Sequence, residues 1–231
     1  MKRNNNYIYP KTIREMIDGK RHYEINGIEK LPSVTTILKA TEPDEKRESL
    51  QAWRDRVGDE NATRIVDESA ARGTAMHKIL EKYILEEGYL DLTNVGKEAH
   101  NMAIQVIQNG LSSVTEFYGS ECTLYYPGLY AGQTDLIATH KGDMAVIDFK
   151  QTNKPKKREW IEDYCLQLAA YGMAHDFVYK TAITKAVIMM CSKDNFYQEF
   201  VIAGEEYRKY KHKWLERVYK YYESKRSTTN T

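Results

Sequence analysis

Gly132-Gln-Thr-Asp135-Leu-Ile-Ala and, after a turn, Ala145-Val-Ile-Asp148-Phe149-Lys150 are the two stretches that decide the fold. Both are short and rich in β-forming residues, so they predict neighbouring strands of one sheet. Asp135 interrupts the first apolar strand, and Asp148 and Lys150 end the second. Antiparallel pairing through the turn can bring Asp135 beside Asp148, and residues two apart on a strand leave the same face of the sheet.

The pattern around these strands predicts an α/β sandwich with a mixed sheet of about five strands flanked by helices. Ser33 begins a short helix as its cap, after a polar lead with a hairpin at 23–28, and residues 45–110 have helical periodicity. We expect a single domain over 1–231, with a mainly helical part at 1–110, a sheet core and C-terminal helix at 111–224, and a frayed tail at 225–231. The expected strands lie at 122–126, 130–138, 144–149, 186–191 and 196–202.

Composition excludes several classes of protein. The 231 residues are 42% hydrophobic and 29% charged, which excludes a mostly disordered chain. A net charge of +1 argues against a surface that grips duplex DNA indiscriminately. Three scattered cysteines argue against a disulfide framework, and no apolar run is long enough for a membrane helix. We therefore expect a cytoplasmic protein, of a bacterium or of a phage in its host, without a membrane partner.

Two neighbouring carboxylates repel each other, and a divalent cation with oxygen ligands compensates their charge best. A lysine beside them can orient a water molecule or neutralise charge on a phosphate. The alternative is that Asp148 caps a turn and Lys150 is a solvated charge at a strand edge.

A third ligand is suggested by Arg72-Gly-Thr-Ala-Met-His77-Lys-Ile-Leu-Glu81. His77 and Glu81 are four residues apart and share a helix face. An isolated helical histidine can equally be a surface residue. Beside an Asp/Asp/Lys sheet site, His77 would complete a metal-binding set.

Five ordered sequence blocks resemble the RecB-like branch of the PD-(D/E)xK nuclease superfamily. Four of them are Gly73-Thr74-x-x-His77-x-x-Leu80-Glu81, Gly132-x-x-Asp135, Asp148-Phe149-Lys150 and Gln167-x-x-x-Tyr171. The fifth, Pro32-Ser33-Val34-Thr35-Thr36, is similar to a segment near the start of mitochondrial genome maintenance exonucleases and their phage-encoded relatives. The resemblance implies a restriction-endonuclease-like core, with the N-terminal helices as an arch over the sheet.

The resemblance also implies roles for single residues. His77, Asp135 and Asp148, with the backbone carbonyl of Phe149, would bind one or two Mg²⁺ or Mn²⁺ ions, and Lys150 would be the catalytic lysine. Gln167 and Tyr171 would support the site or contact DNA, although Tyr171 also continues an apolar stripe. Glu121 opens the strand before the site and could add an outer carboxylate or a ligand to a second metal, or be a simple charge at a strand edge. Glu81 is expected as an outer carboxylate. Some relatives hold an iron–sulfur cluster with four cysteines. Because this chain has only three cysteines, we expect no cluster here.

Nucleic-acid contacts are predicted at three further places. A basic loop follows Lys150 and contains Lys154, Lys156, Lys157 and Arg158, a composition suited to phosphates but also to a solvated loop. Ser33, Thr35 and Thr36 could offer hydroxyl groups to a phosphate or simply cap a helix. Trp53 and Trp160 could stack on bases or lie in the core.

These features favour a metal-dependent DNA exonuclease that takes single-stranded DNA with a free end and acts in replication, recombination, processing or degradation of DNA. A duplex or structure-specific endonuclease of the same superfamily would share the residues. A DNA-binding subunit without activity would usually lack one of them. A zinc hydrolase is poorly supported, because no HExxH or paired His/Cys spacing occurs.

Overall fold

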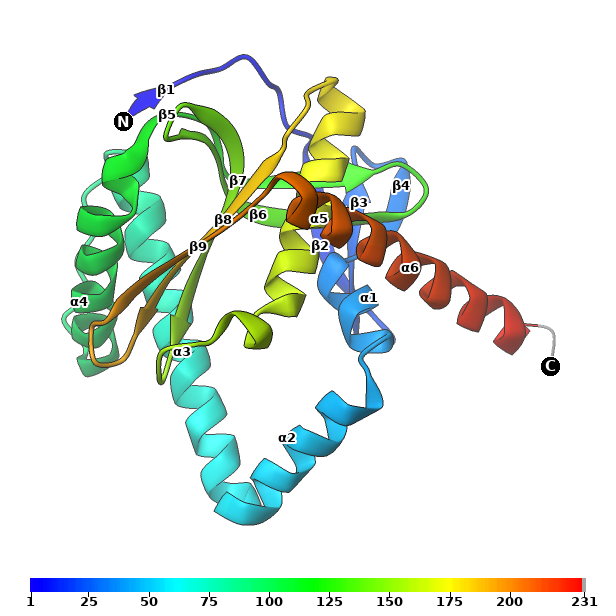
Figure 1. Ribbon diagram of the computed structural model, residues 1–231, viewed down its shortest axis with the longest axis horizontal. Coiled ribbons are helices and arrows are strands. Elements are labelled where there is room, and N and C mark those ends of the chain that lie inside the picture. Colours follow the sequence, from blue (N-terminus) through cyan, green and yellow to red (C-terminus); the bar gives the residue numbers. More distant parts are fainter. Residues whose placement is uncertain (230–231) are drawn as a thin grey trace.

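A mixed sheet forms the centre of the protein (Figure 1). The computed structural model describes residues 1–229. Within them the sheet has six strands, in the order β1 (Lys2–Arg3), β5 (Val114–Tyr126), β6 (Tyr130–His140), β7 (Asp143–Thr152), β8 (Lys185–Ser192) and β9 (Tyr197–Ala203). β1 is parallel to β5 and β7 to β8, whereas the other neighbours are antiparallel. The expected α/β class is confirmed; the expected five strands become six because two N-terminal residues add β1.

A second, three-stranded sheet lies beside the large one and was predicted only as a hairpin. Its strands are β2 (Thr12–Ile17), β3 (Lys20–Ile25) and β4 (Glu29–Pro32). The turn from β3 to β4 contains Asn26-Gly27, both with positive φ, as tight hairpin turns require. β2 is mostly exposed, which explains why its sequence lacks the alternation of a half-buried strand.

Helices cover both faces of the large sheet (Figure 1). They are α1 (Val34–Ala40), α2 (Asp44–Val57), α3 (Asp59–Ile84), α4 (Asn94–Asn109), α5 (Glu162–Tyr179) and α6 (Gly204–Thr229), with short 3₁₀ turns η1 (Leu111–Ser113) and η2 (Arg158–Trp160). The large sheet has a hydrophobic core on each face. Successive side chains of a strand point to opposite faces, so alternate residues of β6 and β7 pack into each core. Leu136 and Ile147 pack with α3 and α4, whereas Ile137 and Val146 pack with α1, α5 and α6.

The arch expected from the sequence is formed by α2 and the N-terminal half of α3, which project from the body of the protein (Figure 1). No residue of α2 is buried. Because α1 packs on one face of the sheet and α3 on the other, α2 passes around the end of the sheet. The two helices meet at Gly58, whose φ of 82° suits glycine.

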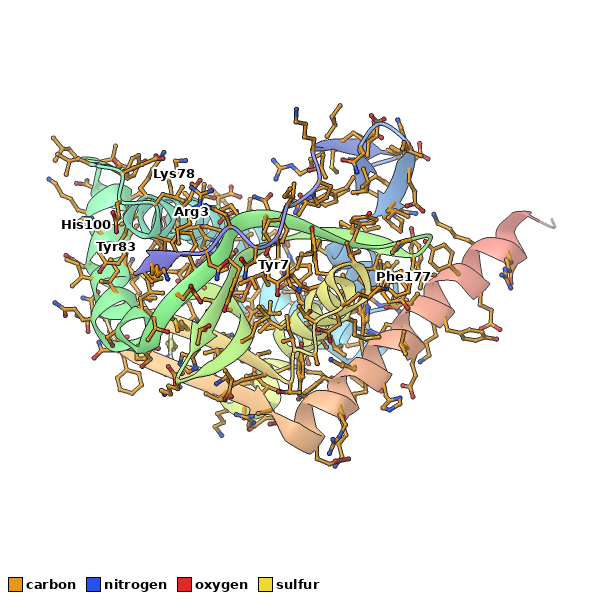
Figure 2. All side chains as sticks on the ribbon, turned by 90° about the horizontal axis from the view of Figure 1, so that it is seen from above. Arg3, Tyr7, Lys78, Tyr83, His100 and Phe177 are labelled. Atoms are coloured by element: carbon orange, nitrogen blue, oxygen red, sulfur yellow. The ribbon has the colours of Figure 1, made fainter. Side chains whose placement is uncertain are left out.

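The chain ends differ from expectation at the C-terminus. The expected tail begins at 225, but α6 continues to Thr229, and 230–231 lie outside the described residues. At the other end, Arg3 and Tyr7 lie on the N-terminal segment, which runs over the large sheet (Figure 2). The ring of Tyr7 packs against those of Tyr118, His175 and Tyr179. The three cysteines are buried thiols. Among the helices of residues 1–229, none combines the length and apolar character of a membrane span.

Candidate metal centre between two strands

The large sheet divides at the candidate site. β6 and β7 are paired from His140 and Asp143 as far as Leu136 and Ile147. Beyond that pair, β6 stays with β5 and β7 stays with β8. The next residues, Asp135 and Asp148, therefore lie at the point where the strands separate. The expectation that Asp148 and Lys150 end their strand is wrong, because pairing with β8 carries β7 on to Thr152.

Asp135 bridges the gap between the strands. Its Oδ2 accepts a hydrogen bond of 2.6 Å from the backbone N–H of Phe149, in place of a ladder carbonyl. Burial raises the pKa of Asp135, but the charge of His77, that of Lys150 and the Phe149 N–H outweigh it, and the net pKa is lowered. Asp135 is therefore a carboxylate held in a fixed orientation.

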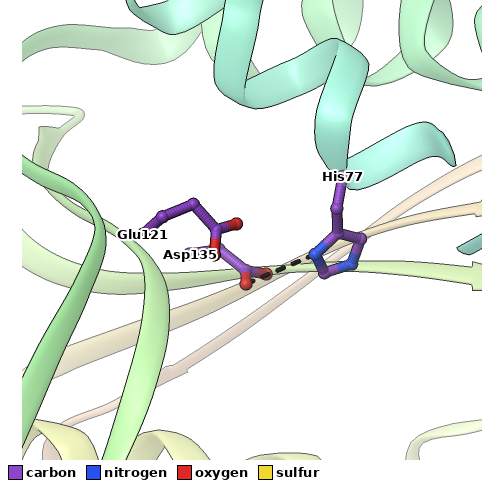
Figure 3. Close-up of side chains that lie close together, drawn as sticks. All are labelled: His77, Glu121 and Asp135. Atoms are coloured by element: carbon purple, nitrogen blue, oxygen red, sulfur yellow. Dashed lines mark ion pairs between the residues drawn. The ribbon is translucent and has the colours of Figure 1, made fainter. Parts of the chain in front are cut away.

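His77 reaches the same point from α3. Its Nδ1 lies 3.4 Å from Asp135 Oδ1 (Figure 3). Its Nε2 lies 2.8 Å from the Phe149 carbonyl oxygen. Donation from both ring nitrogens requires the imidazolium form. Burial lowers the pKa of His77, but the Asp135 carboxylate outweighs this effect and raises the pKa to about 9. A ring nitrogen of His77 must therefore lose its proton before it can bind a cation.

Glu121 joins this group from β5. One ligand atom from each of His77, Glu121 and Asp135 lies within 4.8 Å of the others (Figure 3). Glu121 has a φ of 49°, a left-handed conformation that is rare outside glycine and that often marks functional sites. Gln133 donates to Glu121 Oε2 at 2.7 Å. Burial, followed by the charge of Asp135, raises the pKa of Glu121 to about 7.

The sequence places Glu121 at the opening of its strand. It lies instead within β5, because β5 begins at Val114 and contains bulges that obscure the alternation. Its acidic side chain is the feature of the sequence that pointed to the site. The left-handed backbone conformation of Glu121 could not be predicted from the sequence.

The buried Asp148 forms an ion pair on β7 with the partly buried Lys150. Burial raises the pKa of Asp148 to about 6, Lys150 opposes the rise, and the charge of Asp135 adds to it. Burial lowers the pKa of Lys150, but Asp148 and Asp135 outweigh it and the net pKa is raised. The ammonium also lies 5.0 Å from the ring centroid of Tyr164. Asp148 therefore holds Lys150 charged at the mouth of the strand gap.

The donor set fits a divalent cation. One imidazole nitrogen, several carboxylates and a main-chain carbonyl converge where the sheet opens, and oxygen-rich sets of this kind suit Mg²⁺ or Mn²⁺. Asp148 interacts electrostatically with Asp135 and His77 but lies outside the tightest three-residue group, which contains Glu121. The residues present thus include one carboxylate more than the expected ligand set.

Gln167 and Tyr171 lie on α5, where Tyr171 packs against Gly132 of β6. Tyr171 is buried, and its hydroxyl accepts a hydrogen bond of 3.0 Å from Gln167 Nε2. A Cβ at Gly132 would lie 2.6 Å from the Tyr171 ring, so only glycine allows β6 to approach α5 this closely. The Gly132-x-x-Asp135 spacing therefore combines a packing requirement with a site residue.

Arg72, to which the sequence assigned no role, joins α3 to β7. It is 3% exposed, and its Nε donates to Gln151 Oε1 at 3.0 Å. Gln151 Nε2 in turn donates to the Ser69 carbonyl at 2.8 Å. This network joins α3, which carries His77, to β7, which carries Phe149.

A pocket of about 540 Å³ opens on the α3 side of the site and is lined by His77, Lys78, Glu81 and Glu121, among others. Glu81 is outside the metal-binding group and pairs with Lys78, whose Nζ lies 2.8 Å from Glu81 Oε2. Glu81 thus lines an approach to the site.

The basic loop after β7 divides into two parts. Lys154 and Lys156 line a pocket of about 520 Å³ together with Trp53 of α2, Ile65 of α3 and Trp160 of η2. Lys157 Nζ lies 5.4 Å from the Trp160 ring centroid. Trp160 precedes α5 and is 57% exposed, so the alternative that it lies in the core is wrong.

Arg158, grouped with the basic loop in the sequence, lies apart from this pocket. Its Nε donates to Glu206 Oε1 at 3.0 Å, and its Nη2 donates to the Val201 carbonyl at 2.9 Å. These contacts attach the loop to α6 and β9.

The hydroxyls at the start of α1 are mostly engaged within the protein. Ser33 Oγ accepts from the Thr36 N–H at 2.9 Å, as a helix cap does. Thr36 Oγ1 donates to the Arg21 carbonyl at 2.9 Å. Thr35 is exposed, with its hydroxyl 2.9 Å from Ser33 Oγ. Of the three, Thr35 is best placed to meet a ligand.

Comparison with known proteins identifies homologues over most of the chain. The sequence is 29% identical over 208 residues to mitochondrial genome maintenance exonuclease 1 of Mus musculus and 28% identical over 211 residues to that of Homo sapiens, in each case 85% of this chain. Identity to the Xenopus tropicalis protein is 26% over 220 residues, 83% of this chain. The chain spans 60% of the length of each relative. The resemblance to this exonuclease family is confirmed.

No protein-family model matches the chain. A solved structure of a protein from Eubacterium rectale aligns with 65% of this chain and 63% of its own, at 11% identity and a TM-score of 0.46.

Proposed function

We propose that this homologue of the mitochondrial genome maintenance exonucleases is a Mg²⁺- or Mn²⁺-dependent DNA exonuclease that prefers single strands with a free end. The proposal rests on one observation above all. His77, Asp135 and the Asp148–Lys150 pair converge where β6 and β7 separate, so that cation ligands and a charged amine lie together. Its role would lie in DNA replication, recombination, processing or degradation, in the cytoplasm of a bacterium or an infected cell.

His77, Asp135, Asp148 and the Phe149 carbonyl would hold the cation, with Glu121 positioned for a second ion or for a bound water. A cation there supplies charge stabilisation at the scissile phosphate and lowers the pKa of a water molecule. Lys150 orients that water for in-line attack and donates to the phosphate as negative charge develops. Asp148 keeps the amine in place. The water oxygen would form a new bond to phosphorus and lose a proton to solvent. The bond from phosphorus to the 3′ oxygen would break, and that oxygen would take up a proton from solvent, which gives a 5′-phosphate and a 3′-hydroxyl.

The preference for single strands is supported by the pocket beneath the arch. Trp53 and Trp160 offer aromatic faces, and Lys154 and Lys156 offer positive charge, the combination that binds single strands without reading sequence. Among residues 1–229 neither lysine forms an ion pair with a carboxylate, so both charges are available to phosphates. A strand that passes under α2 would need a free end to enter.

Digestion of end-labelled single-stranded DNA tests the proposal. We expect cleavage with Mg²⁺ or Mn²⁺ and none with EDTA. A covalently closed single-stranded circle should resist, and so should a linear strand carrying streptavidin on biotin at both ends; blocking one end at a time gives the polarity. Degradation of the closed circle at the rate of the linear strand would contradict the exonuclease assignment and favour an endonuclease.

A further inference from the structure

A second pocket adjoins the metal-binding group on the side of the small sheet. It measures about 150 Å³, and its lining includes Arg14, Arg21, Thr35, Glu121 and Gln167; we call it the hairpin pocket. Pockets that hold whole drug-sized ligands are at least about 300 Å³. The hairpin pocket therefore suits a compact group such as a phosphate rather than a nucleoside.

Two arginines from neighbouring strands face this pocket. Arg14 is opposite Tyr23 in the β2–β3 register, and Met16 is opposite Arg21. Positions two apart share a face, so both guanidinium groups lie on the side of the buried Tyr23. Their charges partly offset the rise that burial causes in the pKa of the Tyr23 hydroxyl, which indicates that both are near it.

The pocket carries positive charge that the protein itself does not neutralise. In the described part of the chain, neither Arg14 nor Arg21 forms an ion pair with a carboxylate. The acidic residue of the lining is Glu121, which also belongs to the metal-binding group. Guanidinium groups form bidentate hydrogen bonds with phosphate oxygens.

The pocket is held in place before any ligand binds. The Arg21 carbonyl accepts hydrogen bonds of 2.9 Å from the Ser33 N–H and from Thr36 Oγ1, so β3 is joined to α1. Thr12 Oγ1 lies 2.9 Å from Thr123 Oγ1, which fixes β2 on β5. The small sheet is thus attached to the large sheet and to the start of α1.

We propose that the hairpin pocket binds a phosphate of the DNA strand next to the phosphate that is cleaved, through Arg14 and Arg21. This inference rests on the proposed function and extends it. Glu121 lines the hairpin pocket and also belongs to the metal-binding group, so the two sites adjoin. A phosphate held in the hairpin pocket would therefore determine which phosphodiester linkage of the strand lies at Lys150. The phosphate is either the terminal monoester of the strand or an internal diester.

Binding measurements separate this subsite from cleavage. Labelled single-stranded oligonucleotides are titrated in EDTA with a Lys150→Met protein, with and without Arg14→Gln and Arg21→Gln. We expect the double arginine change to weaken binding at least about tenfold. It should also lower the slope of log K against log salt by about 0.7 for each phosphate that the protein no longer neutralises. Lys20→Gln, on the opposite face of the same hairpin, is the matched control and should change neither.

Four kinds of oligonucleotide distinguish the two sources of phosphate. Three differ at their ends, with a 5′-phosphate, a 3′-phosphate or hydroxyls at both ends, and the fourth is a series in which a single methylphosphonate is moved along the strand. A terminal phosphate is the ligand if the arginine effect disappears with hydroxyl ends. An internal phosphate is the ligand if the effect persists there and one methylphosphonate position reproduces it.

Affinity and salt slope equal to those of Lys20→Gln would overturn the inference. If that happened while the otherwise unaltered protein still bound and cut DNA, the proposed function would stand without this subsite. A protein that neither binds nor cuts DNA would instead remove the proposed function.

Discussion

Replacing Lys150 by methionine should lower the rate of DNA cleavage at least about a hundredfold while leaving DNA binding largely intact. The side chain keeps its length, so the variant removes the ammonium from beside the scissile phosphate and little else. Losing one donor that stabilises developing negative charge typically costs 10²- to 10³-fold in rate. Single-turnover cleavage of a labelled strand at saturating protein measures this loss, and Lys141→Met, an exposed lysine paired with Glu199, is the control.

The Asp148–Lys150 pair also permits a test that separates chemistry from folding. Asp148→Asn alone leaves an ammonium without its nearest carboxylate; breaking a fully buried pair in this way costs about 3–5 kcal/mol of stability, and we expect up to that cost here. Lys150→Met costs less, because Asp148, with its pKa raised to about 6, can take up a proton. The double variant Asp148→Asn/Lys150→Met should melt near the wild type and remain inactive. Wild-type cleavage by this double variant would contradict the assigned roles.

The affinity for Mn²⁺ should rise steeply with pH, because the ligands must lose protons before they bind. With the pKa of His77 at about 9, this residue alone gives about a tenfold gain in affinity per pH unit up to that value. Below pH 7, Glu121 and Asp148 add to the slope. Calorimetric titration in two buffers of different ionisation enthalpy should show that His77 releases about one proton per Mn²⁺ at neutral pH.

His77→Asn should bind Mn²⁺ more weakly at high pH and lose the pH dependence above 7, whereas His100→Asn, an exposed residue of α4, should behave as the wild type. An affinity independent of pH between 6 and 9 would contradict the assignment of His77 as a ligand.

The metal-free protein should show the opposite trend in stability. The folded pKa values of His77 and Asp148 are raised, so each group holds its proton to higher pH than it does in the unfolded chain. Their contribution to stability is complete below the unfolded pKa values and is lost as pH rises through about 6 for Asp148 and about 9 for His77. The rise in melting temperature on adding Mn²⁺ should consequently be larger at pH 8.5 than at pH 6.

The sequence predicted most of the core because periodicity follows burial directly. The strands around Asp135 and Asp148 are short runs of β-forming residues between turns, and the helix carrying His77 repeats its apolar residues at steps of three to four. The sequence predicted only a hairpin in place of the small sheet and did not predict β1, because short exposed strands lack the alternation of apolar and polar residues. Gly132 belongs to a recognisable motif. The reason that glycine is required there is the close approach of Tyr171, which depends on how α5 packs on β6.

The site itself could be predicted only in part. Residue types and order pointed to Asp135, Asp148, Lys150 and His77, which the structure brings to one place. The separation of β6 and β7 depends on how the strands pair in the folded sheet, and no single residue of the sequence indicates it. The left-handed turn at Glu121 likewise depends on tertiary contacts.

The arginine pair was missed for a different reason. Arg14 and Arg21 belong to strands whose register, fixed only by folding, places them on one face.

Anomalous X-ray scattering from crystals soaked in Mn²⁺ tests the central claim most directly. We predict a peak where β6 and β7 diverge, bounded by His77, Asp135, Asp148 and the Phe149 carbonyl, and absent in Asp135→Asn. A protein that cleaves DNA with Mn²⁺ yet shows no peak there, or binds the ion only elsewhere, would contradict this account.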